Sequence, residues 1–334
     1  MLTANDEDSY SRTFRLQAKW LLYTLLCGVA DVLDILLSKM KPSQKPKVSF
    51  EPSDIDDLED DEILELYQDA PEVHPDYSVK RLSPRTVIKA SVDVDVDMSD
   101  APDANASDLV FAETDIPVPR IRRVIRGQED IYFVVQDYIE GSLLADVWST
   151  YSIWRKLGVA FTLRRYVRQL RQLKASPTTP PGPLSAHEPR SCILPPFFGP
   201  SRSERGPFAS YADFASFFNK WAREAYDMQR YPINHPIRDT RFDDSEALVL
   251  THQDINPRNI IVGTDNRLWL IDWEWSGYYP PWFEYIGMVK QLKIEEEHNS
   301  YHEYWNLMIP FVCGPYFEQE KWCSAVEIGL ISSV

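Results

Sequence analysis

The sequence lacks the patterns that define several common classes of protein. Its four cysteines form no CxxC pair and have no histidine at zinc-finger spacing; they are Cys27, Cys192, Cys313 and Cys323. We therefore expect free thiols in a reducing, cytoplasmic compartment rather than a disulfide scaffold or a structural zinc site. A Walker A sequence is also missing from the chain, which excludes a phosphate-binding loop of that type.

An uncharged apolar run long enough to cross a bilayer is missing as well. Residues 20–37 (WLLYTLLCGVADVLDILL) are almost long enough, but they include Asp31 and Asp34. Each aspartate would cost roughly 2.5–3.5 kcal/mol near the centre of a membrane. We interpret residues 17–38 as an amphipathic helix on a hydrophobic protein surface, after a loose polar tail over residues 1–15. A helix on a membrane surface is the second interpretation, and a secretory signal is the third.

Basic residues are fewer than acidic ones, so the formal net charge is −16. Ten of the acids lie between Glu51 and Asp69, and this run contains no lysine or arginine. Such a chain should repel the phosphates of nucleic acids, so we expect no nucleic-acid partner. We interpret the acidic run as a solvated face or tail whose second half forms a short helix.

Hydrophobic residues make up 44% of the chain and aromatic residues 13%, which predicts a globular protein with a buried core. Short strands are expected at residues 86–89, 131–138, 248–250, 260–262 and 268–271. Apolar residues at helical spacing predict helices within 142–175 and over 214–226. The many prolines and polar residues between positions 176 and 207 predict a long irregular connection.

The richest chemical pattern lies at positions 250–272 (LTHQDINPRNIIVGTDNRLWLID). Phosphoryl transfer needs a carboxylate that orients the attacking hydroxyl, and oxygen ligands for the metal ions that bridge the phosphates. Asp254 can serve as that carboxylate, whereas Asn259 and Asp272 can supply an amide oxygen and a carboxylate to the metal. A hairpin over residues 260–271 should bring Asp272 back beside Asn259.

The spacing His252-x-Asp254-x4-Asn259, followed by Asp272 after two short strands, resembles the catalytic and metal-binding loops of protein kinase-like enzymes. The surrounding residues are closer to the aminoglycoside phosphotransferase and choline kinase branch. IDWEWSGYYPPWFEY (271–285) resembles the metal-binding loop of that branch in its fungal form. Three further segments resemble the family in the right order, namely VIK (87–89), TDIPVPRI (114–121) and VVQDYIEG (134–141). The resemblance covers about residues 60–290.

For nucleotide binding, the resemblance implies ATP and Mg²⁺ as cofactors. Lys89 would pair with the α- and β-phosphates. The backbone of the hinge, formed by Gln136, Asp137 and Tyr138, would read the adenine.

For catalysis, the resemblance implies that Asp254 is the catalytic aspartate and that Asn259 and Asp272 are the metal ligands. His252 belongs to the same catalytic loop, which we expect it to hold in shape rather than to do chemistry. For Glu274 and Glu284 a functional and a structural role are both open, and Glu284 is a candidate anchor for the catalytic loop.

The sequence also departs from the family pattern in its first half. Residues 70–88 contain no glycine, so no Gly-rich loop precedes Lys89. The helix acid that orients the lysine in family members should fall near Asn105, which is not acidic. Gln253 stands where bacterial enzymes usually have glycine. These departures support an alternative function, a catalytically weak or inactive kinase-like protein that binds nucleotide or a partner.

The resemblance implies an α+β fold with two lobes, of the protein kinase-like type. We expect a tail and helix over residues 1–45, a small β-rich N-lobe over 46–137, and a larger, mainly helical C-lobe over 138–334. ATP would lie in the cleft between the lobes. The expected activity is transfer of the γ-phosphoryl group of ATP to a hydroxyl of a small molecule, and the oligomeric state is left open.

A protein acceptor is a third hypothesis, and the sequence argues against it. Only eleven residues separate Asp272 from Glu284, and they include Pro280 and Pro281. Protein kinases hold their peptide substrates on a longer segment at this place. The acceptor would instead be held by the large lobe, with residues 176–207 and the helix over 214–226 as walls.

Overall fold

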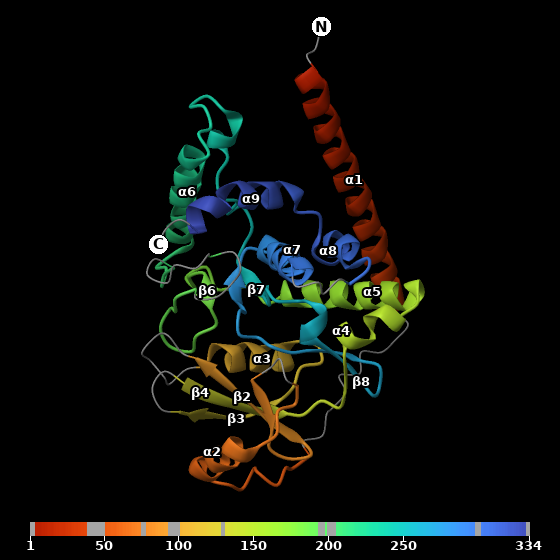
Figure 1. Cartoon of the computed structure of the whole chain (residues 1–334), viewed down its shortest axis with the longest axis vertical. Helices are drawn as coiled ribbons and strands as arrows, with labels where there is room; N and C mark the ends of the chain where they lie inside the picture. The colour runs from red at the N-terminus through yellow and green to blue at the C-terminus, as the bar shows by residue number, and fades with distance from the viewer. Residues whose placement is uncertain are drawn as a thin grey trace.

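The computed structural model describes residues 4–38, 51–74, 78–92, 101–127, 131–192, 198, 205–297 and 302–331. The chain has an α+β fold with two lobes (Figure 1), as the sequence predicted. A four-stranded antiparallel sheet forms the centre of the small lobe, in the order β1 (Val79–Arg81), β2 (Thr86–Val92), β4 (Ile131–Asp137), β3 (Ile121–Arg126). The predicted strands at 86–89 and 131–138 are β2 and β4.

Two helices, α2 (Asp60–Asp69) and α3 (Pro102–Glu113), cover opposite faces of this sheet (Figure 1). Successive side chains of a strand point to opposite faces. Val135 of β4 accordingly packs with Ile63 of α2, whereas Val134 packs with Ala104 of α3. The α3 face is turned towards the second lobe, so α3 lies between the sheet and the rest of the molecule.

The acidic run forms a solvated face rather than a tail, since nine of its ten acids are exposed, and its second half is the predicted short helix α2. Ile55 and Ile63 are buried in the core of the small lobe. Asp56 and Asp60 pair with arginines of β3, at 2.7 Å from Arg122 and 3.0 Å from Arg123. The sequence did not indicate these ion pairs, because the two arginines lie some sixty residues further along the chain, where a local charge pattern does not show them.

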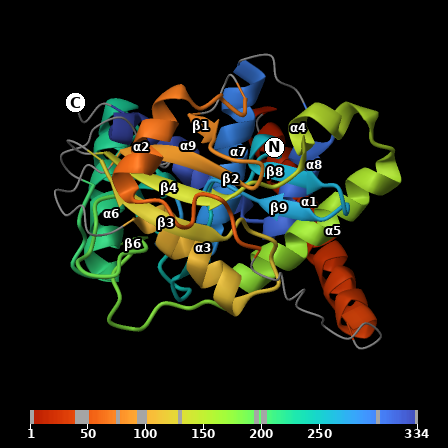
Figure 2. The same ribbon diagram turned by 90° about the horizontal axis from the view of Figure 1, so that it is seen from below.

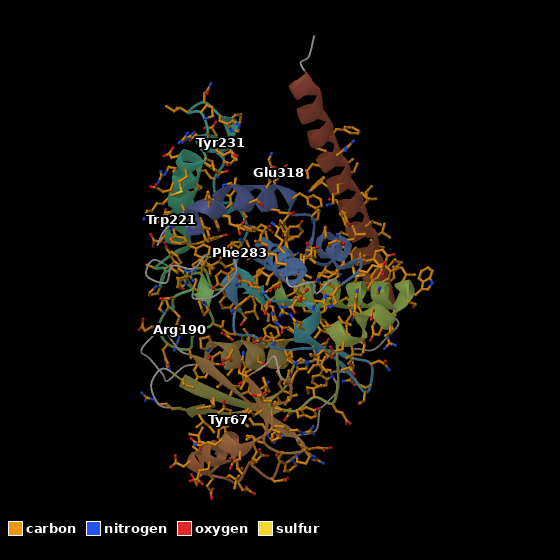
Figure 3. The ribbon with its side chains drawn as sticks, viewed as in Figure 1. Tyr67, Arg190, Trp221, Tyr231, Phe283 and Glu318 are labelled. Atoms are coloured by element: carbon orange, nitrogen blue, oxygen red, sulfur yellow. The ribbon has the colours of Figure 1, made fainter. Side chains whose placement is uncertain are left out.

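The second lobe consists mainly of helices around an aromatic core. Its helices are α4 (Leu144–Val147), α5 (Ile153–Leu170), α6 (Tyr211–Met228), α7 (Trp282–Glu297), α8 (Trp305–Cys313) and α9 (Phe317–Ile331). Phe214 of α6 and Phe283 of α7 lie 5.7 Å apart between ring centroids. Figure 3 shows Phe283 in the middle of this lobe. The predicted helix over 214–226 is α6.

Two small antiparallel sheets carry the loops of the site. One has the order β6 (Gly182–Pro183), β10 (Gly277–Tyr279), β7 (Val249–Thr251), and the other has the order β5 (Gly141–Leu143), β8 (Ile260–Gly263), β9 (Leu268–Leu270). Three short 3-10 turns complete the elements, η1 (Trp148–Thr150), η2 (Pro236–Asp239) and η3 (Pro257–Asn259). Viewed from below, the small lobe with α2, β2, β3 and β4 faces the viewer, and β8 and β9 lie to the right of its sheet (Figure 2).

The helix predicted within 142–175 is shorter than that range, because β5, α4 and η1 precede α5. Gly141 allows β5 to approach β8 closely: a Cβ there would lie 2.3 Å from the carbonyl oxygen of Val262. Ser152 then starts α5, since its side chain accepts a hydrogen bond from the backbone N–H of Arg155.

Helix α1 (Ala4–Ser38) begins earlier than expected and includes residues 4–15, which the sequence suggested were loose. It packs on the second lobe through a narrow stripe that includes buried Cys27 and Ala30. Asp31 pairs with Arg164 of α5 at 2.8 Å, and this ion pair joins the two helices. The sequence predicted that α1 packs on a hydrophobic protein surface. The observed contact is narrow, because most large apolar side chains of α1 remain exposed.

None of the helices in the described part of the chain has the length and apolar character that crossing a membrane requires.

Candidate active site

The catalytic loop between β7 and β8 holds Asp254 in a fixed orientation. Its two carboxylate oxygens accept hydrogen bonds from side-chain amides, at 2.8 Å from Nδ2 of Asn256 and 2.6 Å from Nδ2 of Asn259. Asn256 also caps the short turn η3, because its Oδ1 accepts from the N–H of Arg258. The loop therefore positions one buried carboxylate through its own polar side chains.

Glu284 anchors this loop from α7 below it. Its carboxylate accepts the backbone N–H of His252 at 2.7 Å and that of Gln253 at 3.0 Å. Gln253 has a positive φ of 64°, which the two hydrogen bonds help to hold. Gly287 permits the close contact, since a Cβ there would lie 2.3 Å from the carbonyl oxygen of Gln253. The geometry gives Glu284 the anchoring role that the sequence left open.

His252 ties the catalytic loop to the metal-binding loop. Its Nδ1 accepts the N–H of Asp254 at 3.2 Å, so its Nε2 carries the proton and donates to the carbonyl oxygen of Ile271 at 3.0 Å. Burial lowers the pKa of His252 to about 4, so the ring is neutral near pH 7. Both ring nitrogens are thus occupied by loop contacts.

The hairpin of β8 and β9 brings Asp272 beside the catalytic loop, as expected. Ile260 pairs with Leu270 in the ladder, and the N–H of Ile271 donates to the carbonyl oxygen of Asn259 at 3.1 Å. Asp272 itself has a φ of 67°, in the left-handed region. A non-glycine residue in this region is uncommon and often marks a functional position.

Lys89 of β2 reaches across from the small lobe to the metal-binding loop. Its Nζ lies 2.5 Å from Oδ1 of Asp272 and 3.0 Å from Oε2 of Glu274. Lys89, Asp254, Asn259 and Asp272 come from segments up to 183 residues apart, and the fold gathers them at the junction of the lobes.

The two aspartates of the site have opposite pKa shifts. Burial, and next the charge of Asp272, raise the pKa of Asp254 to about 8. Burial also acts to raise the pKa of Asp272, but the ammonium group of Lys89 outweighs it and holds that pKa below its ordinary value. The site therefore contains one carboxylate suited to accept a proton and one that stays ionised.

The residues present fit a magnesium ion. Asn259 directs its amide nitrogen to Asp254, which leaves its Oδ1 available as a ligand beside the carboxylate of Asp272. Oxygen atoms of this kind are the ligands that Mg²⁺ takes, commonly with one or two carboxylates and substrate phosphates. Within the described ranges, no group of three or more His, Cys, Asp or Glu is placed to hold a metal ion alone.

A cavity of about 290 Å³ lies between the lobes next to the predicted hinge. Apolar side chains from both lobes line it, including Val87 of β2 and Ile261 of β8, and Gln136, Asp137 and Tyr138 form one edge. Flat apolar walls with a polar backbone edge suit a nucleobase.

The hydrogen bonds of this edge single out a residue that the sequence interpretation omitted. The N–H of Asp137 already donates to the carbonyl oxygen of Arg120, and that of Tyr138 to the carbonyl oxygen of Arg85. The N–H of Ile139, which also lines the cavity, makes no hydrogen bond to the part of the chain that the structure describes. Ile139 lies two residues past the end of β4 and directly after the three predicted hinge residues.

The helix of the small lobe does carry an acid near the expected place, Asp103, two positions before Asn105. Asp103 is buried in α3 and accepts hydrogen bonds from Ser91 at 3.2 Å and Tyr132 at 2.9 Å. It lines the same narrow cavity as Lys89, and its charge helps to raise the pKa of that lysine. Asn105 instead donates to the carbonyl oxygen of Leu184. The spacing from residues 116–119 indicated Asn105 and therefore missed Asp103.

The chain is similar to aminoglycoside phosphotransferases of known structure. No curated protein sequence matches the chain. Among solved structures, aminoglycoside phosphotransferase APH(4)-Ia is similar at 12% identity and a TM-score of 0.42, with 82% of this chain and 98% of that chain covered. The streptomycin-ATP-APH(2")-IIa ternary complex is similar at 14% identity and a TM-score of 0.42, with the same coverage of 82% and 98%.

The model of one protein family, described as the phosphotransferase enzyme family, matches residues 97–307, which is more than half of the chain. The match contains the catalytic loop, the metal-binding loop and the hinge. The chain therefore belongs to the phosphotransferase enzyme family, transferases of phosphorus-containing groups.

Proposed function

We propose that this protein transfers the γ-phosphoryl group of ATP to a hydroxyl group of a small molecule, with Mg²⁺ as the metal. The observation that carries the proposal is the position of Asp254. This buried carboxylate is held by two amides, beside the oxygens of Asn259 and Asp272 and at the junction reached by Lys89. Members of the family transfer phosphorus-containing groups, and this arrangement provides the parts that such a transfer needs.

In the proposed reaction, Asp254 orients the hydroxyl group of the acceptor. The hydroxyl oxygen attacks the γ-phosphorus, the bond from that phosphorus to the β,γ-bridging oxygen breaks, and ADP leaves with the electron pair. Asp254, in its ionised form, takes the hydroxyl proton as a general base. Asn259 and Asp272 would hold Mg²⁺, which when bound neutralises charge on the phosphates.

For nucleotide binding, we propose that Lys89 contacts phosphate oxygens and that the cavity beside the hinge receives the adenine. The N–H of Ile139 is the available donor to the ring, within the edge that Gln136, Asp137 and Tyr138 form. His252 would act through the shape of the loop. In this scheme residues 46–137 are the nucleotide-binding lobe, residues 138–334 the catalytic lobe, and residues 1–45 an attachment on the latter.

We propose a small-molecule acceptor because the segment after Asp272 is folded into the lobe. Residues 277–279 form β10 between β6 and β7, and α7 starts at Trp282. Ser276, the only hydroxyl side chain of serine or threonine type between Asp272 and Glu284, is buried and donates to the carbonyl oxygen of Trp273. This segment offers neither a peptide platform nor an accessible phosphosite.

We propose that residues 176–207 and helix α6 form the walls of the acceptor site. Residues 182–184 lie beside the metal-binding loop, because β6 pairs with β10 and the carbonyl oxygen of Leu184 contacts α3. Residues 193–197 and 199–204 lie outside the described residues. Helix α6 buries Phe214 and Phe218 in the core of the lobe, so its contribution would come from other side chains.

A second candidate function, nucleotide binding without turnover, is favoured by one observation. Lys89 is held by Asp272 and Glu274 rather than by an acid of α3, and no glycine precedes it between residues 70 and 88. Thermal unfolding with MgATP should show a rise in melting temperature under either function. Consumption of ATP then separates them.

The decisive assay is ATP consumption with a panel of alcohols, aminoalcohols and aminoglycosides, together with generic protein substrates. At least one hydroxylated small molecule should accept labelled phosphate, and protein should accept little. Robust labelling of protein that is lost in Asp254→Asn would overturn the small-molecule assignment. Binding of ATP without consumption across the panel would favour the second candidate.

A further inference from the structure

One arginine connects the acidic segment before α2 to the hinge. The side chain of Arg122, on β3, is only 6% exposed. Its Nε donates to Oδ1 of Asp137 at 2.5 Å, and its Nη1 donates to both carboxylate oxygens of Asp56, at 2.9 and 2.7 Å. Its Nη2 donates to the carbonyl oxygen of Glu51 at 2.9 Å. A planar guanidinium group presents five N–H donors in a fixed fork on three nitrogens, whereas the three donors of a lysine all leave from one atom.

The segment from residue 51 to residue 58 is itself attached to the strand beside the hinge. Oγ of Ser53 lies 3.4 Å from Oγ1 of Thr86, and the N–H of Ser53 donates to Oδ2 of Asp56 at 2.7 Å. Thr86 is the cross-strand partner of Asp137. The segment therefore contacts the hinge by two routes, through Thr86 and through Arg122.

These contacts determine the orientation of Asp137 almost completely. Its N–H donates to the carbonyl oxygen of Arg120, and its carboxylate is held by Arg122. What remains at this edge of the cavity is the N–H of Ile139, two residues further on. A hydrogen bond to a nucleobase requires a donor placed within a few tenths of an ångström, and that placement depends on rigid support from neighbouring contacts.

We propose that Arg122 is a positioning residue for the nucleobase, and that Asp56 on the acidic segment holds Arg122 in this role. The proposal rests on the proposed nucleotide-binding function and extends it to the side of the site remote from the phosphates. It gives the acidic run a specific role, because part of this run supports the base-binding edge. Loss of this support therefore changes how the protein distinguishes nucleobases.

Arg123 provides a matched control on the same strand. It contacts the same acidic segment, at 3.0 Å from Asp60 and 2.7 Å from the carbonyl oxygen of Leu58, but no contact joins it to Asp137 in the described part of the chain. A general weakening of the segment would follow from either substitution. An effect on the base should follow only from Arg122.

The experiment measures the affinities of the full chain for MgATP, MgGTP and magnesium tripolyphosphate, by calorimetry or by competition. We expect Arg122→Gln to weaken MgATP binding about tenfold, which corresponds to roughly 1.4 kcal/mol. The ratio of ATP to GTP affinity should fall, and tripolyphosphate binding should not change, because that ligand has no base. Arg123→Gln should leave all three affinities within about twofold of wild type, the scale of a weak surface contact.

Two more variants keep the test decisive if Arg122→Gln does not fold. Arg122→Lys retains the charge but loses the planar fork, and Asp56→Asn leaves the contact between Arg122 and Asp137 in place. Both should lower the ratio of ATP to GTP affinity, by less than Arg122→Gln would.

An unchanged ratio in these variants, or equal losses of affinity for ATP and tripolyphosphate, would overturn the proposal. If wild-type protein binds tripolyphosphate and ATP equally, the base contributes nothing and the proposal is also wrong. Absence of any MgATP binding by the wild type would instead refute the proposed function.

Discussion

Replacing Asp254 with asparagine should abolish phosphoryl transfer and at the same time stabilise the folded protein. The reason is that the fold buries this carboxylate beside a second acid, Asp272, which raises the pKa of Asp254 from its ordinary value of 3.8 to about 8. That difference corresponds to roughly 6 kcal/mol of unfavourable free energy for the ionised form. The amide of asparagine carries no charge and avoids this cost.

The gain should be smaller than this bound because the hydrogen bonds change. Both oxygens of Asp254 accept from amide groups, on Asn256 and Asn259, and an asparagine side chain has only one oxygen. The amide nitrogen of the new asparagine would therefore face the amide nitrogen of Asn256 or Asn259, and this unsatisfied contact would cost about 1–3 kcal/mol. We expect a net stabilisation of about 2 kcal/mol near pH 8, in the absence of metal and nucleotide.

The dependence on pH identifies the cause. An unfolded aspartate ionises near pH 3.8 and Asp254 in the folded chain near pH 8, so between these values the folded state holds a proton that the unfolded state has released. The free energy of unfolding that this group contributes therefore falls as the pH rises from about 4 to about 8. The variant lacks this slope, so its advantage over wild type should be absent at pH 4–5 and grow towards pH 8.

Urea unfolding of both proteins at pH 5 and pH 8, with a chelator present, measures this difference, and an ATP consumption assay measures transfer. A variant that is destabilised equally at both pH values would refute the argument from burial. Retained turnover in the variant would remove Asp254 from the mechanism.

Three further predictions concern the metal, the loop anchor and α1. Asp272→Ala should weaken nucleotide binding and remove its dependence on Mg²⁺. The control Asp265→Ala changes an exposed acid of the same hairpin and should have neither effect. Calorimetry of nucleotide binding with and without Mg²⁺ measures both variants. Glu284→Ala should lower the free energy of unfolding by about 2–5 kcal/mol, because two buried N–H groups lose their acceptor, and should lower turnover with it; wild-type stability in this variant would contradict the anchoring role. A chain that starts at residue 46 should lose about 2 kcal/mol of stability with the contacts of α1 but keep its nucleotide affinity, since α1 packs on the second lobe and not on the small one; loss of MgATP binding in calorimetry would contradict this.

The proximity of Asp254, Asn259 and Asp272 could be predicted from the sequence because it depends on local structure. Asp254, Asn259 and Asp272 lie within nineteen positions of the chain, joined by a tight turn and a hairpin whose geometry follows from short-range rules. The strand that carries Lys89 and the strand that leads to the hinge were predictable for the same reason, since a β-branched or aromatic stretch between turns is a local signal.

The support of the site could not be predicted, because it depends on pairs that are distant in sequence. The acids at positions 51–60 have the composition of a solvated tail until β3 brings Arg122 and Arg123 against them. The same holds for Asp31, whose partner Arg164 is 133 residues away. The local sequence does not show whether a charged side chain is solvated or paired, because its partner is brought near only by the fold.

The sequence by itself therefore determined the class of chemistry, since the residue types and their spacing around Asp254 suit phosphoryl transfer and little else. Only the tertiary structure decided which groups remain available for ligands. It showed that the N–H of Ile139 is unoccupied within the described residues while those of Asp137 and Tyr138 are not, and that Lys89 meets Asp272 and Glu274. Spacing along a chain limits which groups can be neighbours, but hydrogen bonds and ion pairs form only where distance and direction are both satisfied in three dimensions.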